Sequence, residues 1–220
     1  MGGLVDRMVA ATALVLLCPV LVMIAAAVSL SSPGGVIYRQ VRVGQGGAAF
    51  RILKFRTMVA GADRLAANIS PAGDPRITSV GRVLRSSYLD ELPQLWNVVR
   101  GDMRLVGPRP ETPEYVALYT RDERRVLEVK PGLVGPSTVG FMDEAERLAG
   151  ADNPEAHYET VLLHERVQLD LDYLERRSGF DDIRLLLRQA LLILTPRSRG
   201  SESAADATKT RVRARLRGNT

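Results

Sequence analysis

Cysteine and histidine are scarce in this sequence, and their scarcity removes several kinds of site. The 220 residues contain one cysteine, Cys18, which excludes an intrachain disulfide and a cysteine-based zinc cluster. The two histidines, His157 and His164, are too few for a histidine-rich metal site. Such sparse cysteine usage fits a reducing compartment.

Net positive charge is confined to the C-terminal tail. The net charge is +5, yet Arg197 to Thr220 alone holds seven basic and two acidic residues, so the remainder is neutral overall. This tail is rich in Ser, Ala and Arg and has little to bury, which predicts disorder. Contact with anionic lipid head groups, nucleic-acid binding and simple solvation all remain open for it. No aromatic residues interleave the arginines, so nucleic acid is not an expected partner.

One long apolar run lies near the N-terminus, from Met8 to Val28. As a straight helix its 21 residues would measure about 32 Å, enough to cross a bilayer core of about 30 Å. Pro19 predicts a kink, since it lacks a backbone donor. A sharp kink would make the segment dip into one leaflet and return, and a spanning helix or a signal peptide cut after Ala25–Ala27 are the alternatives. The cations that follow the segment favour a cytoplasmic location for the rest of the chain.

The pattern of the body predicts a small hairpin followed by helices. Strands are expected at 36–38 and 50–55 around a glycine-rich turn, and no repeat of 20 to 50 residues is visible. We expect helices over 60–67, 80–85 continued by 89–99, 114–129, 154–176 and 182–194. The last helix has a broad apolar face, which we assign to the core rather than to a membrane surface.

Two adjacent acids, Asp90 and Glu91, stand just ahead of Pro93. Proline is tolerated in a first helical turn, so both acids should lie near a helix start, where phosphate is also favoured. Neighbours on a helix point about 100° apart, which favours a division of labour in which one acid attacks and the other holds a metal. Taken alone, the pair is more typical of a helix cap.

Arginines surround this pair in the sequence, and Arg109 lies between two prolines that stiffen its backbone. Arginine matches phosphate oxygens in a bidentate geometry, and acids, a magnesium ion and arginines are the parts of a phosphoryl-transfer site. By themselves, Lys54, Arg56 and Arg109 are more typical of surface charges.

A series of collinear motifs changes this balance. The chain resembles the bacterial sugar transferase family, the monotopic phosphoglycosyl transferases that start glycan assembly on undecaprenyl phosphate, and it resembles their minimal form. The matching strings are Ser32-Pro33-Gly34, Tyr38-Arg39-Gln40, Lys54-Phe55-Arg56-Thr57-Met58, Asp74-Pro75-Arg76-Ile77-Thr78, Leu89-Asp90-Glu91-Leu92-Pro93-Gln94-Leu95-Trp96-Asn97, Gly101-Asp102-Met103 and Val106-Gly107-Pro108-Arg109-Pro110, with a looser match around Asp170 and Tyr173.

The resemblance implies an α+β, mostly helical protein in three parts. Residues 1–32 would form a kinked re-entrant membrane helix and 197–220 the basic tail. Between them, residues 33–196 would form a compact cytoplasmic domain with a small β element and amphipathic membrane-surface helices. The family kinks at a Ser-Pro step, for which this chain has Cys18-Pro19. The implied location is the bacterial inner (cytoplasmic) membrane, with the globular domain facing the cytoplasm.

The resemblance also implies a reaction. Asp90 would attack the β-phosphate of a UDP-sugar, release UMP and hold the phosphosugar until polyprenyl phosphate takes it, which is a first membrane step of exopolysaccharide, O-antigen or glycoconjugate synthesis. Glu91 would bind Mg²⁺, and the phosphate contacts would come from Lys54, Arg56, Arg85 and Arg109. UDP-sugar, polyprenyl phosphate and membrane lipids are the implied partners, and a homodimer is one possible assembly.

The segment 134–143 departs from the family pattern, because it lacks the tryptophan and the arginine that many members carry there. We expect this loop to contact the nucleotide or the sugar, so the donor sugar is left open. The departure also leaves room for a catalytically silent membrane scaffold of the same fold. A single-span anchor with a nucleic-acid-binding tail is a third hypothesis.

Overall fold

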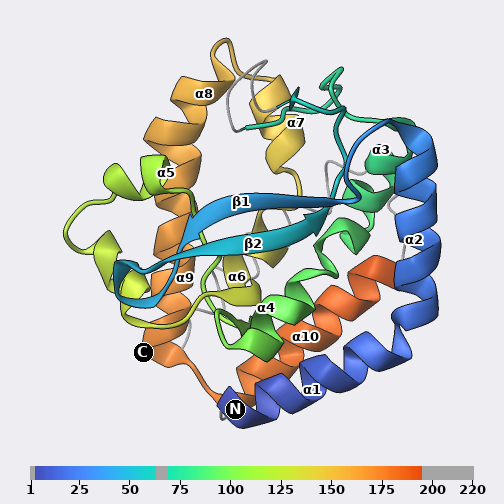
Figure 1. Cartoon of the computed structure of the whole chain (residues 1–220). Coiled ribbons are helices and arrows are strands. Elements are labelled where there is room, and N and C mark those ends of the chain that lie inside the picture. The colour runs from blue at the N-terminus through green and yellow to red at the C-terminus, as the bar shows by residue number, and fades with distance from the viewer. Residues whose placement is uncertain (1–2, 63–68, 195–220) are drawn as a thin grey trace.

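The protein is mostly helical with a small amount of sheet, as the α+β prediction requires. The structure, a computed structural model, describes residues 3–62 and 69–194. In chain order the longer elements are α1 (Gly3–Leu16), α2 (Cys18–Ser31), β1 (Ile37–Val43), β2 (Ala49–Phe55), α3 (Ser79–Ser86), α4 (Gln94–Arg100), β3 (Arg104–Val106), α5 (Pro113–Ala117), β4 (Gly132–Val134), α6 (Pro136–Gly140), α7 (Glu144–Ala149), α8 (Pro154–His157), α9 (Leu163–Arg176) and α10 (Gly179–Leu194). The shorter turns are the 3₁₀ turns η1 (Gln45–Gly47), η3 (Leu89–Glu91) and η4 (Glu123–Glu128), and the π-turn η5 (Tyr158–Leu162). Figure 1 shows the β1–β2 hairpin crossing the middle of the molecule, with α1 and α10 below it and α2 along one side.

The apolar N-terminal segment forms two helices that meet at a bend of 65°. Pro19 cannot donate a hydrogen bond to the preceding turn, and the ladder resumes when the Leu21 amide donates to the Leu17 carbonyl at 2.9 Å. The predicted kink is confirmed. Within the described residues no helix alone is long and apolar enough to cross a membrane, whereas α1 and α2 taken together are.

The hairpin follows the predicted pattern and is longer than predicted. β1 and β2 pair antiparallel from Ile37 opposite Phe55 to Val43 opposite Ala49. Gly46 and Gly47 both have positive φ in the connecting turn, a conformation that glycine adopts without strain. The parallel pair β3–β4, which aligns Arg104 with Gly132, was not predicted.

The predicted helix over 114–129 is wrong. Only α5 and the 3₁₀ turn η4 form there, and an irregular stretch separates them. The Thr120 amide donates to the Glu123 carboxylate at 2.8 Å, and the Glu123 amide donates to the Thr120 hydroxyl at 3.3 Å. This reciprocal capping box starts a new turn and so ends the helical run.

The expected helical continuation over 89–99 is also interrupted. Tyr88 has φ of 57°, the left-handed conformation, which ends the region of α3 before η3 begins. Gly101 stops α4 with positive φ, as predicted. The helix expected at 60–67 lies largely outside the described residues, and so does the tail from 197 to 220.

The two C-terminal helical regions are confirmed, but the orientation of the last one differs from the prediction. Residues 154–176 are helical through α8, η5 and α9, and α10 begins slightly before its predicted start. On α10, Leu186 packs against the core, whereas Ile183, Leu187 and Leu191 are exposed. The assignment of the whole apolar face to the core is therefore wrong, because the helix turns only one edge of that face inward.

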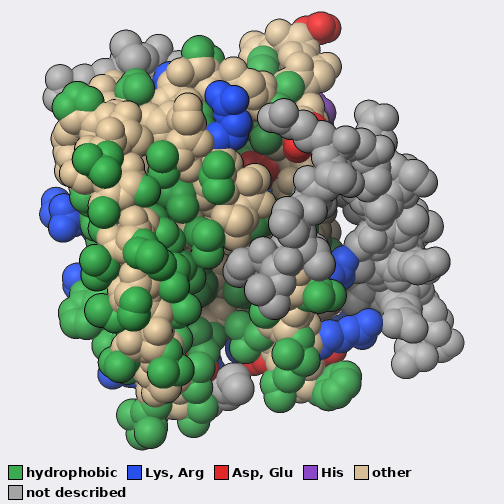
Figure 2. Space-filling model, turned by 90° about the vertical axis from the view of Figure 1, so that its right-hand side faces the viewer, with side chains coloured by type: hydrophobic (Ala, Val, Ile, Leu, Met, Phe, Trp, Pro, Cys, Tyr) green, Lys and Arg blue, Asp and Glu red, His purple; other side chains and the backbone are tan. Residues whose placement is uncertain are grey.

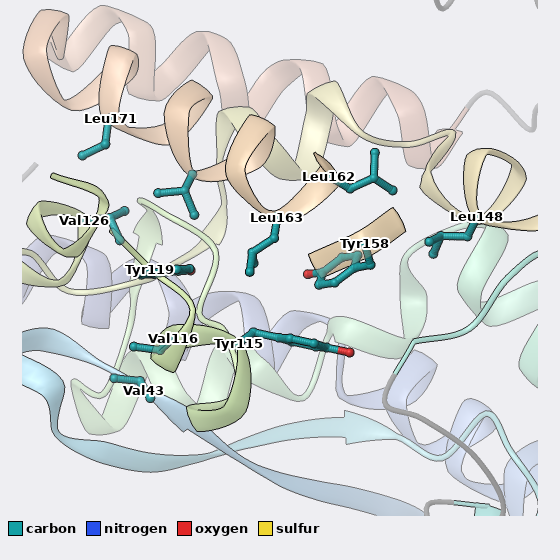
Figure 3. Packing of buried hydrophobic residues seen from close by; sticks show 11 residues of the cluster. Val43, Tyr115, Val116, Tyr119, Val126, Leu148, Tyr158, Leu162, Leu163 and Leu171 are labelled. Atoms are coloured by element: carbon teal, nitrogen blue, oxygen red, sulfur yellow. The ribbon is translucent and has the colours of Figure 1, made fainter. Parts of the chain in front are cut away.

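Across residues 3–62 and 69–194, three hydrophobic clusters hold the fold together. The largest joins α9, η4, α5 and η5, and Figure 3 shows Tyr115 and Tyr158 facing each other within it, with ring centroids 4.8 Å apart. The second packs Ala10 of α1 against α4 and β3. The third packs Ile24 and Val28 of α2 against Phe55 and Leu84. The N-terminal helices thus contribute directly to the packing around the hairpin.

Candidate active site

The adjacent acids lie where the hairpin meets the helical half of the molecule. Asp90 and Glu91 end the short 3₁₀ turn η3, which lies against β2. Lys54 is the penultimate residue of β2, and Arg109 follows β3 in a loop between prolines. The structure therefore brings together residues that are more than 50 positions apart in the sequence.

Asn97 of α4, the helix that follows η3, attaches that helix to β2. Its side-chain amide donates to the Arg51 carbonyl at 2.8 Å, and its side-chain oxygen accepts from the Leu53 amide at 3.1 Å. Asn97 is fully buried, so these bonds replace a missing strand partner along the edge of β2. In the sequence, Asn97 stood out only as part of a matching motif, and its role in attaching α4 to β2 was not predicted.

Glu91 is held by two cations. Lys54 Nζ lies 2.7 Å from Glu91 Oε1, and Arg109 donates to Oε1 at 2.8 Å and to Oε2 at 3.4 Å. Burial raises the pKa of Glu91, but the neighbouring Arg109 and Lys54 outweigh it and hold that pKa well below its usual range. Glu91 is therefore ionised at neutral pH.

Asp90 lies beside this cluster but differs from Glu91 in its pKa and in its hydrogen bonding. Burial raises its pKa to about 6, with Lys54 opposing the shift and the like charge of Glu91 adding to it. Within the described part of the chain, no hydrogen bond reaches its carboxylate. The two acids therefore differ in their surroundings: Glu91 is held by two cations, whereas the Asp90 carboxylate keeps its lone pairs.

The two remaining predicted phosphate contacts lie in different surroundings. Arg85 donates to the Thr57 hydroxyl and to the Ser70 hydroxyl, both at 2.8 Å, and burial lowers its pKa while nearby Asp90 opposes that shift. Arg56 instead donates to backbone carbonyls at the end of α2. The structure therefore groups Arg85 with the acids and turns the Arg56 guanidinium toward the N-terminal helices.

Asp170 of α9 positions the loop that carries Arg109. Its carboxylate accepts from the Arg109 amide at 3.0 Å, from the Ser137 amide at 3.0 Å and from the Ser137 hydroxyl at 2.8 Å. It therefore joins the segments that follow β3 and β4. The matching motif around Asp170 was only loose, but a carboxylate between Val167 and Leu171 on the buried face of α9 is a signal that could have found it.

A cavity of about 400 Å³ opens beside these residues. Among the described residues, seven Lys and Arg side chains line it against four Asp and Glu, so this part of the lining is positively charged overall. The lining also includes the ion pair between Arg42 and Glu111, at 3.0 Å. Such a lining suits an anion larger than a single phosphate.

The segment 134–143 contributes to the lining of the same cavity. Ser137, Thr138, Phe141 and Met142, from α6 and the residues after it, line the cavity. The loop that departs from the family pattern is therefore in a position to contact part of a ligand that extends beyond the acids.

The donor set around Asp90 is compatible with a hard cation bound together with a phosphate ligand. Magnesium is usually held by one or two carboxylates plus phosphate oxygens. Asp90 and Glu91 offer two adjacent carboxylates, and Glu91 Oε2 makes only the longer contact to Arg109. Within residues 3–62 and 69–194 there is no group of three or more His, Cys, Asp or Glu side chains placed to hold a metal on their own.

Known proteins are similar to this chain over most of its length. A family model described as bacterial sugar transferase matches residues 2–196. The chain is 39% identical over 202 residues to a UDP-glucose:undecaprenyl-phosphate glucose-1-phosphate transferase of Caulobacter vibrioides, covering 86% of this chain and 68% of that protein. It is 39% identical over 198 residues to a protein of the same name from Xanthomonas campestris, covering 87% and 38%. It is also 39% identical over 146 residues to a UDP-N-acetylgalactosamine-undecaprenyl-phosphate N-acetylgalactosaminephosphotransferase of Aeromonas hydrophila, covering 64% and 34%. The chain thus spans about two thirds of the first relative and less than two fifths of the other two.

Proposed function

This chain belongs to the bacterial sugar transferase family, and on that premise we propose that it transfers a sugar 1-phosphate from a UDP-sugar to polyprenyl (undecaprenyl) phosphate and releases UMP. The observation that carries the proposal is the contrast between the two acids. Asp90 faces the cavity with no hydrogen bond to its carboxylate among the described residues, while Glu91 is fixed by Lys54 and Arg109. The relatives that name a donor differ in the sugar, so the donor itself is not assigned.

In the first step, the cationic side chains bind the donor before the nucleophile attacks. Lys54, Arg85 and Arg109 bind the diphosphate of the donor and offset its charge. An Asp90 oxygen then attacks the β-phosphorus, the bond from that phosphorus to the bridging oxygen breaks, and UMP leaves with the electron pair. The pKa of Asp90 is raised to about 6, which is still below neutral pH, so the attacking carboxylate form is available.

The second step restores the enzyme. An oxygen of polyprenyl phosphate attacks the same phosphorus, the acyl phosphate bond to Asp90 breaks, and the free carboxylate returns with the lipid diphosphate sugar as product. Glu91 is the residue that would hold Mg²⁺, which when bound supplies further neutralisation of the donor diphosphate.

The lipid acceptor suits the apolar surface of the molecule. Figure 2 shows hydrophobic side chains spread over the face that α2 presents, and the exposed ones include Val22, Met23 and Leu30. The exposed edge of α10 adds Ile183 and Leu187. We infer that these surfaces lie at the inner (cytoplasmic) membrane of a bacterium, with the globular part facing the cytoplasm.

A re-entrant path for α1 and α2 is supported by their length and attachment. Each helix has 14 residues and measures about 21 Å, too short to cross a core of about 30 Å alone. Asp6 near the start of α1 pairs with Arg104 at 2.6 Å, and Arg56 binds the end of α2. Both ends are thus fixed to the same body, which favours a segment that enters and leaves one leaflet.

The test is release of UMP by the purified chain with Mg²⁺, undecaprenyl phosphate and a panel of UDP-sugars. We expect turnover with at least one donor and a loss of about 10³-fold or more in Asp90→Asn, which keeps the shape and removes the nucleophile. If no donor is turned over and Asp90→Asn equals the wild type, the proposal fails and the silent scaffold becomes the better reading.

A further inference from the structure

The guanidinium of Arg56 closes the end of α2. It donates to the Ser32 carbonyl at 2.6 Å, to the Pro33 carbonyl at 2.8 Å and to the Val28 carbonyl at 3.5 Å. The last carbonyls of a helix have no partner within the helix, and a cation near them is favoured by the helix dipole. One side chain therefore satisfies several acceptors at the point where the apolar helix pair leaves the globular part.

The residues on either side of Arg56 belong to the candidate site. Lys54, two positions earlier, binds Glu91, and Thr57, the next residue, accepts from Arg85 Nε. Phe55 between them is buried against Ile24 and Val28 of α2. A strip of four residues thus contacts both the end of the apolar helix pair and the phosphate-binding side chains.

The backbone of the facing turn is shaped to admit this arginine. Gly34 has φ of 119°, and a Cβ at this position would lie 2.2 Å from Arg56 Nη1. Neighbouring Gly35 has no positive φ, and a Cβ there would meet nothing within 4 Å. At Gly34 both the positive φ and the contact with the end of the Arg56 side chain disfavour a side chain, whereas Gly35 has neither constraint.

We propose that Arg56 is a positioning residue, which holds the α1–α2 pair against the strand bearing Lys54 and so sets the height of Asp90 relative to the membrane surface. The inference rests on the proposed function and concerns its second step. The UDP-sugar arrives from solution and does not depend on that height. The phosphate of a polyprenyl lipid is confined to the head-group level. Whether that phosphate can reach the phosphosugar on Asp90 therefore depends on the height of Asp90.

The experiment separates the two steps. Exchange of labelled UMP into the UDP-sugar reports the donor step alone, and transfer to undecaprenyl phosphate in vesicles of phosphatidylethanolamine and phosphatidylglycerol reports both. For Arg56→Ala we expect exchange within about twofold of the wild type and vesicle transfer lowered about 10-fold or more, with a higher KM for the lipid. A short, water-soluble polyprenyl phosphate should restore most of the transfer, because it is not tied to the membrane surface.

Two glycine variants test the contact between Arg56 and the end of α2 without changing the arginine. Gly34→Ala should reproduce the loss of vesicle transfer, and Gly35→Ala should not. Arg51→Ala, an exposed arginine on the same strand, is the matched control for loss of charge. Arg56→Lys should recover part of the transfer, since a single ammonium replaces some of the contacts made by the fork of Arg56.

Three results would overturn the proposal. Loss of exchange with a raised KM for the UDP-sugar would make Arg56 a donor contact instead. Equal losses with the soluble and the vesicle acceptor, together with a lowered Tm, would leave only a structural role. Unchanged transfer in Arg56→Ala would remove the role altogether. Failure of the proposed function is distinguishable from all of these, because the wild type itself would then neither exchange nor transfer.

Discussion

Removing the charge of Glu91 should destabilise the protein through the two cations that it leaves behind. In Glu91→Gln the shape is kept, but Lys54 and Arg109 lose the carboxylate they share. The side chains are 9% exposed for Glu91, 17% for Lys54 and 24% for Arg109, so the cluster resembles a buried pair more than a surface one. Breaking a buried pair on one side typically removes about 3–5 kcal/mol, and with Asp90 as a partial counter-charge we expect about 3 kcal/mol.

The assay is urea unfolding in detergent, followed by the fluorescence of Trp96, the single tryptophan, which lies on α4. Glu128→Gln changes an exposed acid and is the matched control, for which we expect a shift below about 0.5 kcal/mol. The double variant Lys54→Met with Glu91→Gln should regain about 1–2 kcal/mol relative to the sum of the single changes, because it removes one uncompensated cation. Strict additivity, or a Glu91→Gln protein as stable as the control, would refute the coupling between Glu91 and Lys54.

Three further predictions concern the frame around the site. Bonds to Arg76 lower the pKa of Asp74 to about 2. The stabilisation by ionised Asp74 is therefore complete above the ordinary pKa near 3.8 and is lost as the pH falls through 2. In unfolding titrations, the stability difference between the wild type and Asp74→Asn should shrink by about 2 kcal/mol from pH 5 to pH 2, and a constant difference would contradict this prediction. Asn97→Ala removes the partner of the Leu53 amide and of the Arg51 carbonyl and should lower the unfolding free energy by about 1–3 kcal/mol. A loss under about 0.5 kcal/mol would mean that these groups find other partners. Gly132→Ala places a Cβ 2.1 Å from the Gly107 amide, which should displace the loop that carries Arg109 and lower the rate of UMP release about 10-fold or more. Wild-type kinetics would show that the segments around Gly107 and Gly132 can move apart without affecting the site.

The sequence predicted the local elements better than their breaks. The hairpin and its glycine turn, the kink at Pro19 and the stop at Gly101 follow from residues whose backbone preferences act within a few positions. The capping box of Thr120 and Glu123 is also local and could have been read, because Thr-x-x-Glu is a known start signal. The left-handed Tyr88 could not, since tertiary packing holds a non-glycine residue in that conformation.

The sequence suggested which side chains would gather around the acids, but not their geometry. Resemblance to a family placed Asp90, Glu91, Lys54 and Arg109 on one list, and the structure brings these four together. Neither motif nor charge could reveal that Arg56 turns to the end of α2, because the acceptors are backbone carbonyls and leave no trace in the sequence.

The sharing of hydrophobic clusters between the N-terminal helices and the rest of the chain has a consequence for cooperativity. Ala10 is fully buried against α4 and β3, and Val28 is fully buried beside Phe55. A chain that begins after Ser32 would expose both of these packing surfaces, so it would not be an independent folding unit. The α1–α2 segment and the rest of the chain should melt in one transition, and any reagent that loosens the first acts on the stability of the second.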